Sequence, residues 1–135
     1  MATLTPTLTL ASNDISTAET LNLTLSNALT IDGPVITYRL LINSSSTLIA
    51  TDNAIATAAD FTKAHILLYN TSATAGDTIN IGIGASTGTL TAASTFLSLG
   101  PGEFAWFPWD STNTLIADAV QNIPELEVRI YQVAS

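Results

Sequence analysis

The feature of this sequence that most constrains its fold is the regular alternation of apolar and polar side chains over short segments. In residues 35–43 every second side chain is apolar: Ile36, Tyr38, Leu40 and Ile42. A two-residue period places such side chains on one face of a β-strand. Similar segments recur between clusters of Gly, Asn, Asp and Ser, which is typical of an antiparallel sandwich or barrel. The sequence therefore predicts an all-β fold, an antiparallel two-sheet sandwich of the jelly-roll or immunoglobulin-like type with about seven to nine strands.

The same alternation predicts where the strands lie and how some of them sit in a sheet. The predicted strands are residues 3–10, 19–26, 35–43, 63–70, 77–86, 95–99, 103–107 and 126–133. Residues 63–70 are apolar on both faces, so we expect this strand to lie inside its sheet. Pro6 cannot donate a backbone hydrogen bond, so residues 1–12 are expected to form an edge strand or an extended N-terminal arm.

Turn residues separate the predicted strands in the first half of the chain. Asp32-Gly33-Pro34 predicts a turn that precedes the strand beginning at residue 35. Residues 43–47 predict a hairpin loop that leads into a short strand at 48–49. Residues 54–59 are small and without a clear pattern, and a short helix fits them.

Glycines carry the strongest turn signals in the second half. Gly100-Pro101-Gly102 predicts a hairpin that joins residues 95–99 and 103–107, because Pro sets φ at the first central position and Gly tolerates positive φ at the second. Gly82 and Gly84 alternate with isoleucines in a predicted strand. Glycine inside a strand predicts the close approach of another backbone or a bulge.

Length and charge limit the classes of protein to which the chain can belong. Its 135 residues are predicted to form one domain, residues 1–135, which buries roughly two-thirds of its surface. Charged residues make up 10% of the chain, the net charge is -8, and the basic residues are Arg39, Lys63 and Arg129. Phosphate backbones and anionic membranes bind clustered Lys and Arg, so we expect neither nucleic acid nor membrane as a partner. Residues 1–6 do not resemble a secretory signal, which predicts synthesis and folding in a cytoplasm.

No motif in the sequence predicts catalysis. The chain has no cysteine, which removes disulfides, thiolate metal ligands and a thiol nucleophile. The single histidine, His65, lies within a predicted strand with no nucleophile elbow beside it, so we expect a structural role. Asp110-Ser111-Thr112-Asn113 and Asp52-Asn53 offer oxygen ligands for hard cations, but turn capping explains them better. We predict that the protein is not an enzyme and uses no cofactor or metal.

Both tryptophans and two of the four phenylalanines lie within one short segment of the chain. If this segment is a strand, Phe104 and Trp106 share one face, while Phe107 lies on the other. Trp109 lies beyond Pro108 and is the candidate for an exposed contact. Aromatic side chains are enriched at the centres of protein interfaces, so these residues are candidates for binding. The alternative is that all four aromatic side chains fill the core.

The second half of the chain also carries a characteristic series of strands and turns. The series is Ile66-Leu67-Leu68-Tyr69-Asn70, a Gly-Asp loop, Ile79-Asn80-Ile81-Gly82-Ile83, and Leu99-Gly100-Pro101-Gly102-Glu103-Phe104 before a final strand. Over residues 63–133 this series resembles small virion proteins of tailed bacteriophages, especially capsid decoration or cement proteins.

The resemblance implies a β-sandwich or jelly-roll protein that is made in the host cytoplasm and docks on the capsid surface of the virion, often as a trimer. The implied partners are the major capsid protein and other copies of the chain, and avidity among many copies multiplies modest affinities. We expect the contacts in the N-terminal arm and the aromatic segment, at Thr3, Leu4, Thr5, Pro6, Phe104, Trp106, Phe107 and Trp109.

The residues leave two other classes of function open. A carbohydrate-binding or receptor-binding β-sandwich module would use Trp106 and Trp109 as exposed platforms for sugar rings. A hydrolase would need two carboxylates at the mouth of one cleft, and the sequence ties no two of its eleven acidic residues together.

Overall fold

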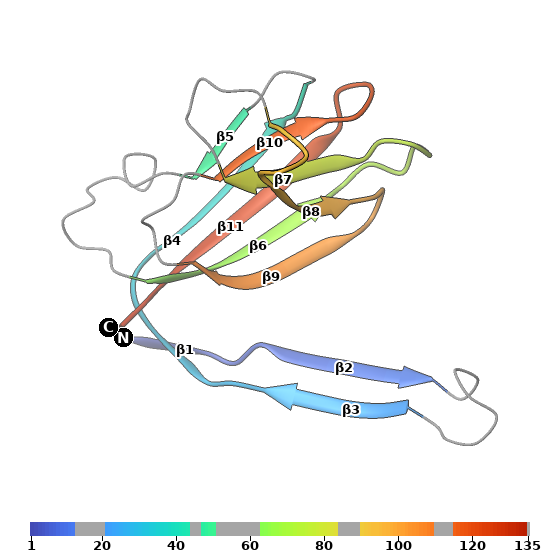
Figure 1. The fold of residues 1–135 in the computed structure, drawn as a ribbon. Helices are drawn as coiled ribbons and strands as arrows, with labels where there is room; N and C mark the ends of the chain where they lie inside the picture. Colours follow the sequence, from blue (N-terminus) through green and yellow to red (C-terminus); the bar gives the residue numbers. More distant parts are fainter. Residues whose placement is uncertain (13–20, 44–46, 51–62, 84–89, 110–114, 135) are drawn as a thin grey trace.

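The computed structural model describes residues 1–12, 21–43, 47–50, 63–83, 90–109 and 115–134. Within these ranges eleven strands form two packed sheets and a separate two-stranded hairpin (Figure 1). The predicted all-β, two-sheet sandwich is confirmed, with more strands than the seven to nine expected. None of the described residues belongs to a helix with the length and apolar character needed to cross a bilayer.

Every strand pairs with its neighbours in the antiparallel sense. The five-stranded sheet has the order β1 (Ala2–Leu4), β4 (Leu29–Leu41), β11 (Glu125–Val133), β6 (Ala64–Asn70) and β9 (Phe104–Trp109). The four-stranded sheet has the order β5 (Thr47–Ala50), β10 (Leu115–Ala119), β7 (Ile79–Ile83) and β8 (Thr95–Leu99). The hairpin consists of β2 (Thr7–Ser12) and β3 (Leu21–Ser26).

The hydrophobic core lies between the two sheets and follows the predicted alternation. From the five-stranded sheet it takes Ala64, Ile66, Leu68, Leu126, Val128 and Ile130, all of them buried. From the four-stranded sheet it takes Ile79, Ile81, Leu99, Leu115, Ala117 and Ala119. β6 lies between β11 and β9, so the prediction that this strand is internal is confirmed.

A fully buried amide side chain, that of Asn70, ties the two sheets together at one end of the sandwich. Its Nδ2 donates hydrogen bonds to the backbone carbonyl oxygens of Asp77, at 2.7 Å, and Leu99, at 3.0 Å. Its Oδ1 accepts a hydrogen bond from the backbone N–H of Ser72 at 3.1 Å. Asn70 ends β6, Leu99 ends β8 and Asp77 leads into β7, so one side chain holds three strand ends in place.

The predicted turn at Asp32-Gly33-Pro34 is wrong, because β4 runs through these residues without a break. β4 pairs with β1 along one edge at residues 29–31, and with β11 along the other edge at Ile31 and again from Val35 to Leu41. The register between β11 and β4 shifts between Tyr131 and Val133, opposite residues 32–34. A bulge-like irregularity takes up extra residues in one strand, so Asp32-Gly33-Pro34 lies within a continuous strand where a turn was expected.

Two predicted hairpins are also wrong, because strands adjacent in sequence belong to different sheets. β8 pairs with β7, whereas β9 pairs with β6, so Gly100-Pro101-Gly102 crosses between the sheets. The turn itself has the predicted geometry: Gly102 has a φ of 74°, and the Glu103 N–H donates to the Gly100 carbonyl oxygen at 3.1 Å. In the same way β5 pairs with β10 and not with β4.

Gly82 lies where another backbone comes close, as predicted. A Cβ atom at this position would lie 2.4 Å from the carbonyl oxygen of Ser94. The pairing of β7 with β8 also shifts register between Ile81 and Gly82, a bulge-like irregularity at the predicted place. Gly84 and residues 54–59 lie outside the described residues.

We predict that Asn70→Ala lowers the free energy of unfolding by about 2–4 kcal/mol, because it leaves two buried carbonyl oxygens without a donor. Asn80→Ala is the matched control, since Asn80 accepts one exposed hydrogen bond from Ser98, and we expect a loss below about 1 kcal/mol. Urea unfolding followed by tryptophan fluorescence measures both. Equal losses in the two variants would show that Asn70 does not hold the sheets together.

Candidate protein-binding surface

The hairpin of β2 and β3, called the arm from here on, lies apart from the sandwich along most of its length (Figure 1). Its register places Leu8 opposite Leu25 and Leu10 opposite Leu23, so these side chains share one face, the leucine face. Each of the four side chains is 38–56% exposed. Full burial of a leucine contributes about 1.5–3 kcal/mol. Covering the exposed part of each of these side chains would therefore contribute about 1 kcal/mol more.

The arm is also free of charge in its described part. Residues 1–12 and 21–31 contain no Asp, Glu, Lys or Arg, although the chain as a whole has a net charge of -8. The acidic residues Asp14 and Glu19 follow in the connection between β2 and β3, outside the described residues. An isolated two-stranded hairpin is marginally stable in water, so an exposed apolar arm is typical of a segment that packs against a partner.

Aromatic rings cover part of the outer face of the five-stranded sheet, the face turned away from the core. The Trp106 ring stacks on the His65 ring, with centroids 5.3 Å apart and planes 27° apart. Trp106 also contacts Tyr131, with centroids 5.5 Å apart. Phe104, two residues along β9, is 65% exposed. The β9 edge of this face therefore presents aromatic surface above a histidine that Trp106 keeps buried.

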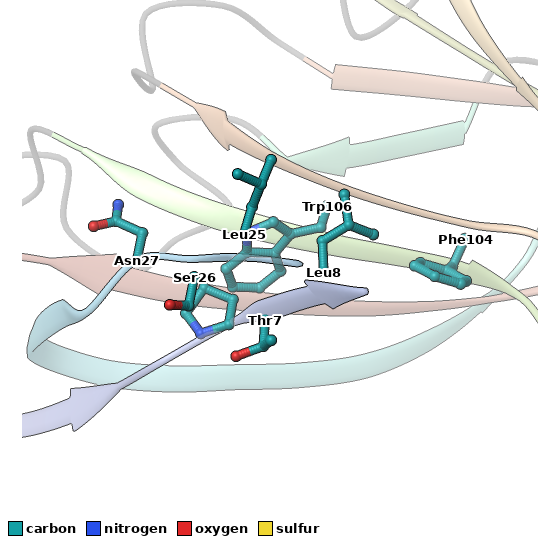
Figure 2. Close-up of a pocket in the computed structure, with 8 residues that line it drawn as sticks. Thr7, Leu8, Leu25, Ser26, Asn27, Phe104 and Trp106 are labelled. Carbon is teal, nitrogen blue, oxygen red and sulfur yellow. The ribbon is translucent and has the colours of Figure 1, made fainter. Parts of the chain in front are cut away.

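A groove of about 300 Å³ lies between the arm and this aromatic surface. The arm lines it with Pro6, Thr7, Leu8, Leu25, Ser26 and Asn27, and the sheet lines it with Phe104 and Trp106. In Figure 2 Leu8 and Leu25 extend from the arm toward Trp106. Leucine, proline and aromatic side chains make most of its wall, so the groove fits an apolar segment better than a charged one.

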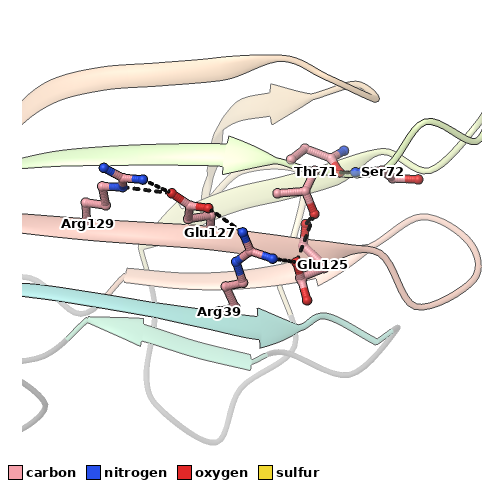
Figure 3. Close-up of polar contacts among 7 residues, drawn as sticks. Arg39, Thr71, Ser72, Glu125, Glu127 and Arg129 are labelled. Atoms are coloured by element: carbon pink, nitrogen blue, oxygen red, sulfur yellow. Dashed lines mark hydrogen bonds and ion pairs between the residues drawn. The ribbon is translucent and has the colours of Figure 1, made fainter.

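Toward β4, the same outer face carries a band of paired charges (Figure 3). The Glu127 carboxylate lies 2.6 Å from the Arg129 guanidinium and 3.1 Å from that of Arg39. Arg39 also pairs with Glu125 at 3.0 Å. The hydrogen bond from Arg129 lowers the pKa of Glu127 below its ordinary value of 4.5. Two cations balance two anions here, so this part of the face carries no net charge.

The structure brings only some of the predicted contact residues together. Pro6, Phe104 and Trp106 line the groove. Thr3 and Thr5 are exposed and Leu4 is half-buried at the base of the arm.

Phe107 and Trp109 point the other way, into the sandwich. Phe107 is half-buried and packs edge-on against Phe96, with centroids 6.1 Å apart. Trp109 is 6% exposed and belongs to the core, so the expectation that it is exposed is wrong. β9 continues through Pro108 to Trp109, and strict alternation places Trp109 on the inner face together with Phe107.

Sequence reasoning missed the leucine face as a binding surface and missed the Arg39–Glu127 pair. The leucines at positions 21, 23 and 25 show the alternation of an ordinary strand, and no signal in the sequence says that their face stays uncovered. Arg39 and Glu127 lie opposite each other only because β4 pairs with β11.

His65 lies buried on β6, beneath the ring of Trp106. Burial, and then the charge of Lys63, lower its pKa below the ordinary 6.5, so the ring is neutral at physiological pH. Among the described residues no three His, Cys, Asp or Glu side chains gather as a metal site. The two segments considered for cations, at residues 52–53 and 110–113, lie outside the described residues.

Comparison with known proteins assigns no family to this chain. No family model matches the sequence, and no curated protein matches it. A solved structure of Bacillus endospore appendages, described as a novel family of disulfide-linked pili, aligns with a TM-score of 0.49 and 17% sequence identity. The alignment covers 79% of this chain and 91% of that chain. This similarity is too low to indicate a shared function.

We predict that stability falls as the pH drops below about 6.5, because the unfolded chain then binds a proton at His65 more readily than the folded one does. Asp77 and Glu127 also have lowered pKa values, but their contributions are lost only below their ordinary values of 3.8 and 4.5. His65→Phe, which keeps a ring under Trp106, should therefore flatten the dependence between about pH 7.5 and about pH 5. Urea unfolding across this range measures it, and an unchanged slope would contradict the assignment.

We predict that Glu127→Gln destabilises the protein at neutral pH more than Glu125→Gln does. Glu127 is buried between two guanidinium groups, whereas Glu125 is partly exposed, forms an ion pair with Arg39 and accepts a hydrogen bond from the Thr71 hydroxyl at 3.2 Å. Loss of the Glu127 charge leaves two cations close together with no anion between them. Thermal unfolding at low and high salt measures both variants, and equal melting temperatures would contradict the prediction.

Proposed function

We propose that this chain is a non-enzymatic structural protein that binds other protein surfaces, and that its particular role is to decorate and stabilise the capsid of a tailed bacteriophage. The observation that carries the first part is the arm, whose described strands carry no charge and whose exposed leucine face lies beside Phe104 and Trp106. The capsid role rests on the resemblance of residues 63–133 to decoration proteins. The proposed place of action is the capsid surface, after synthesis in the host cytoplasm.

The composition of the groove supports a protein partner. Exposed apolar patches rimmed by polar residues mark interaction sites, and buried aromatic anchors supply most of the binding energy at protein interfaces. Phe104 is the most exposed aromatic side chain beside the groove, and the paired charges of Arg39 and Glu127 lie beyond it on the same face. A partner can therefore bury the apolar part without removing an unpaired charge from water.

The carboxylates of the outer face support a role without catalysis. Glycoside hydrolysis needs one carboxylic acid with a raised pKa next to an ionised carboxylate. Glu125 and Glu127 are the acidic pair on this face, but the pKa of Glu127 is lowered and Arg39 bridges the two groups. Both side chains therefore belong to the band of paired charges on the outer face.

Many weak contacts suit a protein of this kind. A capsid presents its surface in many identical copies, so each bound chain lies next to others at high effective concentration. The proposed partners are the major capsid protein and other copies of the chain. Modest contacts through the arm are then enough for stable attachment.

Carbohydrate binding is the second candidate function. Its site would differ from the pair of exposed platforms, Trp106 and Trp109, that the sequence predicted. Trp109 is in the core and cannot stack on a sugar. A shallow depression on the outer face is instead lined by Leu67, Tyr69, Phe104, Glu127 and Arg129. An aromatic platform next to charged hydrogen-bonding groups is an arrangement that suits a sugar ring.

We predict that the purified protein co-sediments saturably with capsids that lack it, and that Phe104→Ala weakens this binding at least about tenfold. Phe96→Ala is the matched control, because Phe96 is 52% exposed but lies on β8, away from the groove. A protein that does not co-sediment with capsids would contradict the capsid role. Binding to immobilised glycans that Phe104→Ala abolishes would then favour the second candidate.

A further inference from the structure

We propose that the partner of the leucine face is the leucine face of a second copy of this chain, packed against it about a two-fold axis. This inference deepens the proposed function, on which it partly rests, by naming one of the surfaces that the arm binds. It assigns the arm to a pair of chains, whereas the resemblance to decoration proteins implies a trimer.

The first argument is that the arm contains a surface that can match itself. Leu8 faces Leu25 across the hairpin and Leu10 faces Leu23, so the leucines form two rungs. A two-fold axis brings the same patch of two identical chains together, and such an interface needs a surface complementary to itself. Two flat ladders of leucine meet this requirement. Each arm then covers the apolar side chains that the other exposes.

The second argument is electrostatic. Two copies that each carry a net charge of -8 repel one another at most points of contact. The described strands of the arm carry no charged residue, so two leucine faces can meet without placing like charges opposite one another. The apolar groove at the base of the arm, between Leu8, Leu25 and Trp106, is closed by the same contact.

The third argument is composition. The leucine face takes every second residue of two six-residue strands, and the adjoining groove adds Pro6, Asn27, Phe104 and Trp106. Leucine and aromatic side chains with Thr, Ser and Asn around them, and no charged residue among them, match the usual composition at the core of a protein interface.

The absence of cysteine makes a direct test simple. Leu10→Cys and Leu23→Cys place a single thiol on the leucine face, and Thr9→Cys and Thr24→Cys place one on the opposite face of the same strands. Leu10, Leu23, Thr9 and Thr24 are all exposed, so the four variants are expected to fold alike. Under mild oxidation we expect disulfide-linked dimers from the two leucine positions, at least about tenfold faster than from the two threonine positions.

Light scattering on the unmodified protein completes the test. We expect the mass of a dimer, and we expect Leu10→Asp with Leu23→Asp to convert it to a monomer, while Thr9→Asp does not. A monomeric or trimeric mass, or equal cross-linking from both faces, overturns the inference. A dimer of this kind that does not bind capsids supports the inference and contradicts the capsid role. A monomer that binds capsids contradicts the inference and supports the capsid role.

Discussion

The fully buried amide of Asn70 determines how the two sheets of this protein meet. A buried amide must satisfy its donors and acceptor, and this one, at the end of a strand of the five-stranded sheet, does so with the backbone of Leu99 in the four-stranded sheet and of Ser72 and Asp77 in the connection between β6 and β7. Its position at the end of β6 thereby places that strand relative to β7 and β8. β6 carries His65 and Leu67 on its outer face and pairs with β9, so the aromatic surface lies on the strand that Asn70 links to the second sheet and on its neighbour.

The molecule separates the residues that stabilise it from those that are available for binding. The sandwich buries isoleucines and leucines from both sheets and balances its outer-face arginines with Glu125 and Glu127. The arm does neither, since its leucines remain exposed and its described strands carry no charge. If the proposed function is right, changes to the arm alter association and leave the sandwich intact.

The sequence predicts those properties that belong to a single strand and misses those that depend on its neighbours. Alternation is a property of one strand, and it correctly places Phe104 and Trp106 on one face and identifies a sandwich. It does not say which sheet a strand joins, so it predicts a hairpin at Gly100-Pro101-Gly102 where the structure has a crossing between sheets. β10, short and rich in alanine, has too weak a pattern to predict at all. The same limit applies to the candidate site. The exposure of the leucine face and the burial of Trp109 depend on what packs over each residue, which the pattern of a single strand does not contain.

The position of β11 in the five-stranded sheet bears on how the chain folds during synthesis. β11 lies between β4 and β6, although both are translated long before it. Until β11 has left the ribosome, β4 and β6 each carry an edge of unpaired backbone groups, and such edges recruit other strands. Non-local pairings of this kind also slow folding. A nascent chain that stalls before β11 is therefore an aggregation-prone species with two open edges, and its survival depends on whatever shields those edges in the cell.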